Sequence, residues 1–509
     1  MRPKQAKLNA LMPRWYLRSK NRILLVAATI GLLWSISGCG NAAGTTSSKT
    51  FSNGSLTGTY TYTLNGSTFS AQGSEPYQEI GTFVADGNGN ITGGMDDFMQ
   101  NLSLSSGPVA GSYSVSGDGT GMMSLNVTRG KIQLAMTLVS GSSLYLIEFD
   151  TFASGAGAVV PQNTSAISTP PSGTFVFHFH SSQPNGGALT SVSSVGLMTI
   201  QSGIISGTED VVRAGTPGSY DISGSMTTPD SNGRGTATIT DGAGVTCNYI
   251  YYVIDPNTLR FLENDRGIQG GGKVEAQNGG PFSNATLKNG FVFSSSGATL
   301  SNSFGVNSVG VFSGDGNGYI VSGNYDAVID GSPVSDVPLG GTYQVSSLGR
   351  ATITLNLRGL GPLPLIAWMV SPTQAFYLVS TPDRAEDGRL DQQQGGPFSA
   401  SSLKGSFAFY MFGNDTQTPP IIDRVGVISF DGSTSLTFTN YFVNRGGATA
   451  QNGPVSGSYM VDANGRVLAS SVGVVNTQVI YLTSNNAGSL ILGANGDELA
   501  GSIAQQTPP

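Results

Sequence analysis

Gly280-Pro281-Phe282-Ser283 and Gly396-Pro397-Phe398-Ser399 are the same four residues, 116 positions apart in a chain of 509. A second recurring feature is a glycine followed, directly or after one residue, by an aromatic ring. It occurs at Gly58-Thr59-Tyr60, Gly173-Thr174-Phe175, Asn289-Gly290-Phe291 and Gly405-Ser406-Phe407. These aromatic residues are 115, 116 and 116 positions apart. Because this period is far longer than a solenoid repeat, it predicts four domains in tandem, each with its own core.

The repeat also sets the expected domain boundaries. We expect β domains over residues 55–163, 172–279, 280–395 and 396–506, preceded by a signal peptide over 1–38 and a small polar tether over 39–54. In the middle of each unit the order Gly, Ser or Thr, Tyr recurs. It places four tyrosines at matching positions, namely Tyr113, Tyr220, Tyr343 and Tyr459.

Within the first unit, short strand-like runs are separated by turn-forming residues. The runs are 60–64, 79–84, 91–98, 111–115, 122–127, 132–139, 144–149 and 155–160. Asp86-Gly87-Asn88-Gly89 stands between the second and third runs, and such pairs accept the positive φ that a tight hairpin requires. The pattern predicts an all-β fold with about eight antiparallel strands in each unit.

Eight antiparallel strands close into an up-and-down barrel whose lumen is filled by side chains or holds one small ligand. We therefore expect four tandem eight-stranded barrels, with β-sandwiches of the immunoglobulin type as the alternative. A meander of eight strands that opens on glycine and an aromatic residue resembles the calycin barrels, the lipocalin and avidin-like group. Lipocalins carry Gly-x-Trp at this place, where this chain has Tyr or Phe.

The first 38 residues have the pattern of an export signal. Seven Lys and Arg residues and no acidic residue occupy positions 1–22, and a short apolar run over 23–33 follows. Ile36-Ser37-Gly38-Cys39 resembles the lipobox of bacterial lipoproteins. The resemblance implies that Cys39 carries lipid, including palmitate, and that Gly40, not being Asp, gives no inner-membrane retention. A plain signal peptide or an N-terminal membrane anchor is the alternative.

Charge excludes one class of partner. The whole chain has 24 Lys and Arg against 31 Asp and Glu, and removal of residues 1–38 takes seven of the basic residues and no acidic one. The remaining 17 basic and 31 acidic residues give a formal net charge of −14. Since nucleic-acid binding depends on basic residues that neutralise phosphates, we expect no nucleic-acid partner.

His178 and His180 are the only histidines, and they lie two apart in a strand-like run. They share one face of that strand, while Phe175, Phe177 and Phe179 occupy the other. The three phenylalanines form the natural core face, so we expect both histidines to face solvent. A two-histidine metal site is the alternative, but the fourth repeat has Tyr410 and Phe412 at the matching positions.

Two loops have a spacing similar to that of a calcium loop, Asp86 to Asp97 and Asp315 to Asp326. Their sixth places hold isoleucine where an EF-hand needs glycine, and strands rather than helices flank them. We therefore interpret them as turns. The column formed by Asp97, Asp210 and Asp326 is a candidate for holding a cation or capping a barrel rim, although the fourth repeat has Phe442 there.

No catalytic constellation is recognisable, and we expect no enzyme, no cofactor and no metal. The neighbouring acids Asp96-Asp97, Glu209-Asp210 and Glu386-Asp387 should point to opposite faces of their strands, which does not make a paired-carboxylate site. Cys247 lies in a strand-like run and is interpreted as a small buried hydrophobic residue.

These observations lead to two hypotheses of function. The first is a non-enzymatic protein, lipid-anchored at Cys39 to a bacterial membrane, at the outer membrane or cell surface, that displays repeated β domains for interaction or adhesion with an extracellular partner. The alternative is a binder of small apolar ligands inside the barrels. Tyr60 and Tyr62, with their counterparts in the third and fourth repeats, are expected to point inward and fill the lumens, which favours the first hypothesis. The ligand-binding residues themselves are unknown.

Overall fold

The structure is a computed structural model that describes residues 49–70, 73–100, 103–185, 188–265, 269–300, 305–415, 421–471, 478–494 and 497–509. Residues 49–509 form one compact unit. The expected signal peptide and Cys39 lie outside the described residues. Among the residues that the structure describes, no helix is long and apolar enough to cross a membrane.

Barrel 1 is the first antiparallel sheet. Its strands are β1 (Thr57–Ser70), β2 (Gly73–Asp86), β3 (Asn90–Gln100), β4 (Ser103–Pro108), β5 (Ala110–Val115), β6 (Thr120–Val127), β7 (Gly130–Ser140), β8 (Ser143–Glu148) and β9 (Ala153–Pro161). β1 pairs with both β2 and β9, which closes the sheet. β4 and β5 both pair with β3, so the two segments together take the place of one strand.

Barrels 2 and 3 are closed barrels of eight strands each. Barrel 2 contains β10 (Gly173–Asn185), β11 (Ala188–Gln201), β12 (Ile204–Arg213), β13 (Thr216–Met226), β14 (Arg234–Asp241), β15 (Thr246–Asp255), β16 (Thr258–Glu263) and β17 (Gln269–Ala276). Barrel 3 contains β18 (Lys288–Thr299), β19 (Gly305–Asp315), β20 (Tyr319–Ile329), β21 (Ser332–Val345), β22 (Arg350–Leu357), β23 (Gly361–Ser371), β24 (Gln374–Val379) and β25 (Arg384–Gln392).

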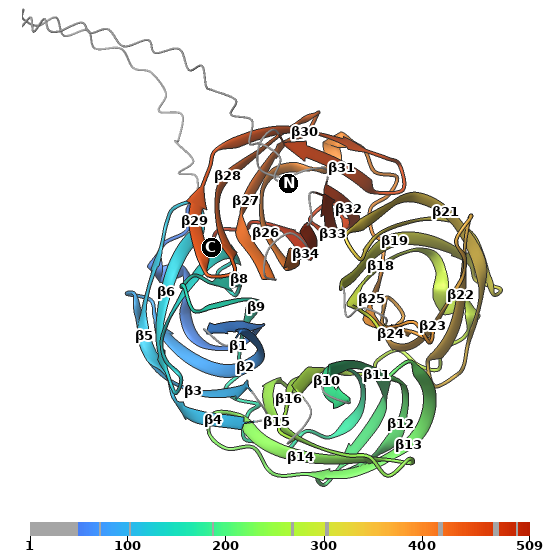
Figure 1. The fold of residues 1–509 in the computed structure, drawn as a ribbon, viewed down its shortest axis with the longest axis horizontal. Coiled ribbons are helices and arrows are strands. Elements are labelled where there is room, and N and C mark those ends of the chain that lie inside the picture. The colour runs from blue at the N-terminus through green and yellow to red at the C-terminus, as the bar shows by residue number, and fades with distance from the viewer. Residues whose placement is uncertain are drawn as a thin grey trace, which may run out of the picture. The chain divides into compact units, whose positions relative to one another are not determined.

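Barrel 4 repeats the arrangement of barrel 1. Its strands are β26 (Lys404–Asp415), β27 (Ile421–Asp431), β28 (Ser435–Arg445), β29 (Ala448–Asn452), β30 (Val455–Val461), β31 (Arg466–Ser471), β32 (Gln478–Ser484), β33 (Ala487–Ala494) and β34 (Asp497–Gln505). β29 and β30 both pair with β28 and together replace one strand. The expected fold class, four eight-stranded antiparallel barrels in tandem, is therefore confirmed, and the sandwich alternative is wrong (Figure 1).

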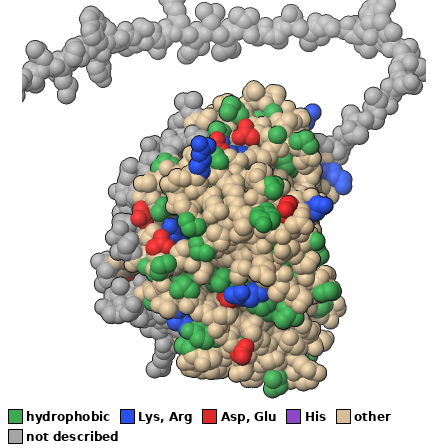
Figure 2. Space-filling model, turned by 90° about the vertical axis from the view of Figure 1, so that its right-hand side faces the viewer, with side chains coloured by type: hydrophobic (Ala, Val, Ile, Leu, Met, Phe, Trp, Pro, Cys, Tyr) green, Lys and Arg blue, Asp and Glu red, His purple; other side chains and the backbone are tan. Residues whose placement is uncertain are grey.

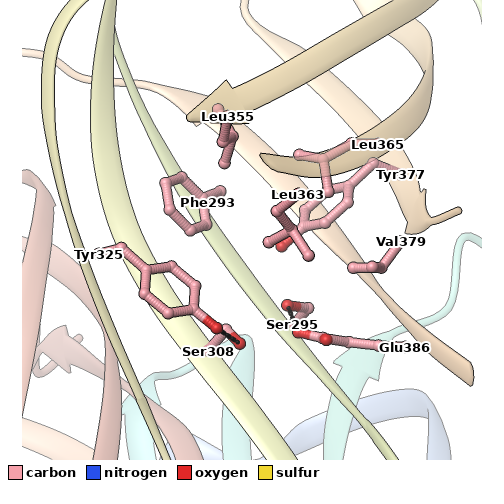
Figure 3. Close-up of a pocket in the computed structure, with 10 residues that line it drawn as sticks. All are labelled: Phe293, Ser295, Ser308, Tyr325, Leu355, Leu363, Leu365, Tyr377, Val379 and Glu386. Atoms are coloured by element: carbon pink, nitrogen blue, oxygen red, sulfur yellow. Dashed lines mark hydrogen bonds between the residues drawn. The ribbon is translucent and has the colours of Figure 1, made fainter. Parts of the chain in front are cut away.

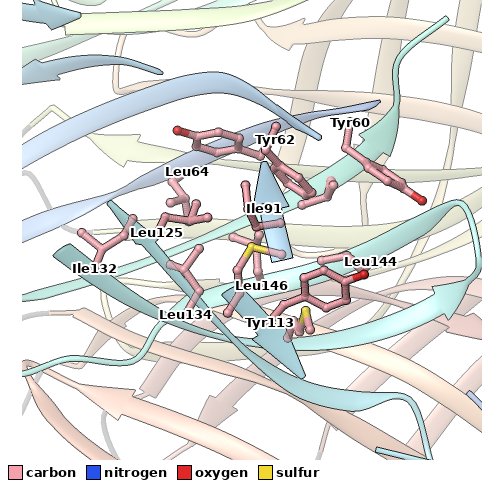
Figure 4. Close-up of a cluster of buried hydrophobic side chains, with 14 of the residues drawn as sticks. Tyr60, Tyr62, Leu64, Ile91, Tyr113, Leu125, Ile132, Leu134, Leu144 and Leu146 are labelled. Atoms are coloured by element: carbon pink, nitrogen blue, oxygen red, sulfur yellow. The ribbon is translucent and has the colours of Figure 1, made fainter. Parts of the chain in front are cut away.

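Each lumen is occupied by inward-facing side chains of its strands. In barrel 1 these include Tyr60, Tyr62 and Leu64, two residues apart on β1, as a strand with period two requires (Figure 4). Equivalent buried clusters fill the other three barrels. The first aromatic residue of each repeat is at most 2% exposed, which confirms the inward orientation expected from the sequence: Tyr60, Phe175, Phe291 and Phe407.

A glycine on the neighbouring strand makes room for the second ring of the repeat. Gly196 pairs with Phe177, and Gly310 pairs with Phe293. A Cβ atom on Gly196 would lie 2.5 Å from the Phe177 ring, and one on Gly310 would lie 2.2 Å from the Phe293 ring. Because carbon atoms pack at about 3.5–4.0 Å, any larger residue would displace the ring.

One glutamine at the end of each barrel binds the next barrel in the chain. The Nε2 atoms of Gln162, Gln277 and Gln393 each donate to two backbone carbonyl oxygens of the barrel that follows, at 2.7–2.9 Å. Gln506 donates in the same way to the carbonyl oxygens of Asp118 and Leu138, both at 2.9 Å. These residues belong to barrel 1, so the contacts between barrels run in a closed cycle.

The start of the described chain differs from the expected tether over 39–54. Phe51 is 4% exposed and belongs to the core cluster of barrel 1, and a short 3-10 helix, η1 (Asn53–Ser55), follows it. Phe282 and Phe398 of the repeated Gly-Pro-Phe-Ser junctions are buried to the same extent and precede η2 (Asn284–Leu287) and η3 (Ala400–Ser402). Residues 49–54 are therefore the first junction of the repeat, because burial of the phenyl ring fixes them on the barrel.

Candidate functional site

The aspartate column contacts the neighbouring barrel. Asp97 on β3 accepts hydrogen bonds from Arg234 Nε at 2.6 Å and Arg234 Nη2 at 2.8 Å. It also accepts one from the Tyr252 hydroxyl at 2.6 Å. Arg234 and Tyr252 are paired residues on β14 and β15 of barrel 2. A bidentate arginine and a phenol thus satisfy one buried carboxylate across the interface.

The same arrangement recurs at the next two interfaces. Asp210 accepts hydrogen bonds from Arg350 Nε at 2.8 Å and from Trp368 Nε1 at 2.9 Å. Asp326 accepts them from Arg466 Nε at 2.8 Å, Arg466 Nη2 at 2.7 Å and the Tyr481 hydroxyl at 2.6 Å. The column is therefore structural, and each aspartate joins its own barrel to the next one.

The interface between barrels 4 and 1 is built differently. Phe442 takes the place of the aspartate, and the pair Thr120 and Thr137 takes the place of arginine and its aromatic partner. Phe442 lies in an apolar cluster, where it packs edge-on against Phe149 with ring centroids 5.3 Å apart. We call this interface the apolar seam. Polar contacts also stabilise the apolar seam, among them the hydrogen bond from the Ser154 hydroxyl to Asp423 at 2.6 Å.

The expectation that His178 and His180 face solvent is right only in part, because their side chains are 26% and 37% exposed. They lie on the outer face of β10, opposite the three core phenylalanines, and barrel 3 partly covers that face. The carboxylate of Asp387 on β25 contacts both imidazoles, and its oxygens lie 3.2 Å from His178 Nδ1 and 2.6 Å from His180 Nδ1. Burial lowers the pKa of His180, but the charge of Asp387 and its hydrogen bond outweigh burial and hold that pKa above its ordinary value.

Ser193 completes this cluster without forming a catalytic triad. Its hydroxyl donates to Asp387 at 2.9 Å and lies 3.3 Å from His180 Nδ1. In a triad the serine and the aspartate approach opposite nitrogens of the imidazole, whereas here both approach Nδ1. Ser193 is also fully buried. The cluster therefore binds barrel 2 to barrel 3 and offers no reachable nucleophile.

The neighbouring acids point to opposite faces of their strands. Asp97, Asp210 and Asp387 face adjacent barrels, whereas their preceding residues face the lumens. Asp96 accepts a hydrogen bond from the Tyr62 hydroxyl at 2.6 Å, and Glu386 accepts one from the Ser295 hydroxyl at 2.5 Å. Burial, together with the charge of Glu79, raises the pKa of Asp96 well above its ordinary value.

The two loops with calcium-like spacing are hairpin turns in which the backbone satisfies the aspartate. Asp86 Oδ1 accepts hydrogen bonds from the amides of Asn88 and Asn90 at 2.7 and 3.0 Å. Asp315 Oδ1 accepts them from the amides of Asn317 and Tyr319 at 2.7 and 3.1 Å. The side chain and amide of Asn90 hold the pKa of Asp86 below its ordinary value, at about 2.

The lumen of barrel 3 contains one described pocket (Figure 3). Phe293, Leu355 and Leu363 line its apolar part, and Tyr325 with Glu386 lines its polar end. The space around these side chains that no atom fills is about 170 Å³, open solvent included, and no part of it has room for a water molecule. This lumen is therefore filled, and a small apolar ligand would have to displace core side chains.

Barrel 2 carries a cluster that the sequence analysis missed. Cys247 is half-buried and packs at the edge of the barrel 2 core, whereas the sequence predicts a small buried hydrophobic residue there. Its sulfur also lies within 4.8 Å of carboxylate oxygens of Glu263 and Asp265. Burial, followed by the charge of Glu263, raises the pKa of the Cys247 thiol well above its ordinary value. The residues come from neighbouring strands, and no short motif marks them.

The outer surface carries no concentrated charge on the face drawn in Figure 2. Lys, Arg, Asp and Glu lie singly or in small groups among polar atoms there, and hydrophobic side chains are scattered between them. A few large apolar side chains of the described chain are strongly exposed, including Tyr319 at 62% and Val321 at 65%.

Comparison with models of known protein families gives no match, and no curated protein sequence matches either. Among solved structures, intact Ap-TbpB with its N and C lobes is 9% identical, with 89% of this chain and 95% of that chain covered and a TM-score of 0.21. A mutant of transferrin binding protein B from Haemophilus parasuis Hp5 is 9% identical, with 74% and 86% covered and a TM-score of 0.19. Isotype 1 of the same protein from serogroup B Neisseria meningitidis is 9% identical, with 71% and 84% covered and a TM-score of 0.19. Similarities this low carry no partner or activity over to this chain.

Proposed function

We propose that this chain is a non-enzymatic, lipid-anchored protein of the bacterial cell envelope that meets an extracellular partner with its outer surface. The observation that carries the proposal is the filling of the lumens. All four barrels have buried clusters of inward-facing side chains, and the pocket in barrel 3 has no room for a water molecule. Binding of an apolar ligand inside a barrel, the alternative function, requires a cavity that the pocket described in barrel 3 does not provide.

The interfaces between barrels support a role for the assembly as one body. Each barrel is fixed to the next by buried charge pairs or by the apolar seam, and a glutamine bridges every junction. A partner would therefore meet several barrels in a constant arrangement. This pre-organisation reduces the entropic cost of binding.

The exposed apolar residues are the contact points we propose for the partner. Tyr319 and Val321 lie two residues apart on β20, so they share one face of that strand. Aromatic residues at the centre of an interface often contribute most of its binding energy. We propose that this pair belongs to the contact surface.

The envelope assignment rests on the N-terminal pattern and is tested first. Wild type and Cys39→Ala chains are expressed with a labelled palmitate analogue in a bacterium that processes lipoproteins. We expect label on the wild type only, and surface proteolysis of intact cells should degrade it. Label on the Cys39→Ala chain would refute the lipobox assignment.

The binding proposal is tested by photo-crosslinking on intact cells. A crosslinking amino acid is placed at Tyr319 in one chain and at the exposed polar residue Thr352 of the same barrel in a matched control. We expect a discrete adduct from position 319 that is absent or much weaker from position 352. Equal adducts from both positions, or none from position 319, would contradict the proposed contact.

A further inference from the structure

The end of barrel 2 brings a thiol and two carboxylates together. Cys247 lies on β15 two residues before Tyr249, which pairs with Glu263 on β16, so Cys247 and Glu263 approach on the same face of the hairpin. Asp265 follows two residues later. The sulfur of Cys247 and one carboxylate oxygen from each acid all lie within 4.8 Å of one another.

Asp265 is held in this position by its neighbours. Its two oxygens accept hydrogen bonds from the backbone amide of Asn248 at 2.5 Å and from the Asn248 side chain at 2.7 Å. A carboxylate retains further lone pairs when it accepts two such bonds. Asp265 is therefore oriented towards Cys247 and still able to bind a cation.

The burial of Glu263 and its unpartnered oxygen are a second, independent indication of a ligand at this cluster. The Glu263 side chain is 2% exposed, and its Oε1 atom has no hydrogen-bond partner among the described residues. Neither Glu263 nor Asp265 forms an ion pair within the part of the chain that the structure describes. Arg213, a cation whose charge acts on Glu263, forms an ion pair with Asp241 at 2.9 Å. A buried carboxylate without a counter-charge is costly unless it is protonated or a cation occupies its open side, and burial raises the pKa of Glu263 to about 7.

Barrel 1 provides a comparison within the same chain. By strand register, Glu148 matches Glu263, Asp150 matches Asp265 and Ile132 stands where barrel 2 has Cys247. In barrel 1, Glu148 forms an ion pair with Arg129. Arg129 lies three residues before Ile132 in the sequence. Barrel 2 has Gly244 at the place of that arginine. One barrel thus combines its carboxylates with an arginine, and the other combines them with a thiol.

We propose that Cys247, Glu263 and Asp265 bind a divalent metal ion of the zinc type, with water as the fourth ligand. On binding, the Cys247 S–H bond breaks, its proton passes to solvent and a sulfur–metal bond forms without any redox change. Zinc accepts sulfur at about 2.3 Å and oxygen at about 2.0–2.2 Å in tetrahedral geometry, which places ligand atoms about 3.6 Å apart. Small side-chain rotations bring the observed atoms to that spacing. Calcium and magnesium select oxygen ligands and do not match a site that contains a thiol.

The sequence expectation of no metal rested on the scarcity of histidine and cysteine. That count detects sites made mostly of these two residue types. It does not detect one cysteine combined with two carboxylates that meet only through the β15–β16 pairing.

Cobalt replaces zinc in such sites and reports sulfur ligation directly. The full chain is titrated with Co²⁺ and then with Zn²⁺. We expect one equivalent of Co²⁺ with a thiolate-to-cobalt charge-transfer absorption that Zn²⁺ abolishes. The Cys247→Ser chain should lack the absorption, and Glu263→Gln should weaken Zn²⁺ binding by at least about tenfold, since metal affinity depends on every deprotonated ligand.

A matched control distinguishes metal binding at this site from metal binding by a thiol at any exposed position. The Cys247→Ser/Thr352→Cys chain has the same number of thiols but no adjacent carboxylate pair, and we expect it to lack the stoichiometric cobalt signal. Alkylation of the wild-type chain needs no variant, and Zn²⁺ should slow modification of Cys247. Absence of the charge-transfer absorption in the wild type, equal Zn²⁺ affinity in the Cys247→Ser chain, or no protection from alkylation would overturn the proposal.

Discussion

Replacement of Asp326 by alanine should be among the most damaging single changes at an interface between barrels. The side chain of Asp326 is fully buried and that of its partner Arg466 is 4% exposed. Without the carboxylate, the buried guanidinium keeps only the exposed Asp336, at 3.8 Å, as a counter-charge among the described residues, and the Tyr481 hydroxyl loses its acceptor. Removal of one member of a buried ion pair costs about 3–5 kcal/mol. We expect Asp326→Ala to lower the free energy of unfolding by this amount.

The second interface supplies an internal control with the same design. Asp210 binds Arg350 as Asp326 binds Arg466, but the Arg350 side chain is 34% exposed. Water therefore hydrates the guanidinium when the carboxylate is removed. The loss that remains is the unpaired Trp368 N–H group, for which about 1–3 kcal/mol is typical. Asp210→Ala should cost less than Asp326→Ala.

Urea unfolding followed by circular dichroism measures both variants and completes a double-mutant cycle. The Asp326→Ala/Arg466→Ala chain removes both charges, so its loss should be smaller than the sum of the two single losses. The reasoning is refuted if Asp210→Ala is at least as destabilising as Asp326→Ala, or if the two changes in the cycle are additive.

Two further predictions concern a core ring and a buried acid. Phe291→Ala should destabilise barrel 3 by about 3–5 kcal/mol, because a fully buried ring is lost and a cavity remains. Calorimetry should show one thermal transition split into two. An unchanged transition would show that the ring is not needed for packing. Burial raises the pKa of Asp423 at the apolar seam to about 8, from about 4 in the unfolded chain. Since the folded pKa is the higher one, stability contributed by the protonated acid is complete below about pH 4 and is lost as the pH rises to about 8. Asp423→Asn should make the decline in melting temperature between these pH values shallower, and a profile parallel to that of the wild type would exclude this role.

The fold was predictable because its determinants are local. Turn residues such as Asn88-Gly89 and the alternation along β1 act over a few positions, and the third repeat has the same turn pair at Asn317-Gly318. The inward direction of Tyr60 and Phe291 follows from period two alone. The packing of residues 49–54 was missed because the tether assignment considered composition only, although Phe51-Ser52 matches the Phe-Ser of the two later junctions.

The contacts between barrels were not predictable from any single strand. The outer face of His178 and His180 is polar, and nothing in β10 reveals that Asp387 of another barrel covers it. The role of the aspartate column could have been predicted by comparing the repeats with one another, because its arginine partners recur as the aspartates do. Arg234, Arg350 and Arg466 recur with the same 116-residue period. Where the fourth repeat replaces the aspartate with Phe442, the barrel it contacts has a threonine in place of the arginine.

The central claim is that the lumens are filled, so that recognition takes place on the outer surface. The mass of the processed protein, purified from the envelope and measured under native and then denaturing conditions, tests this claim most directly. The covalent lipid that we propose at Cys39 would contribute equally to both masses. We predict equal masses, apart from a metal ion on barrel 2. A constant excess of the native mass, equal to that of a small organic molecule, would contradict the claim and favour a ligand held inside a barrel.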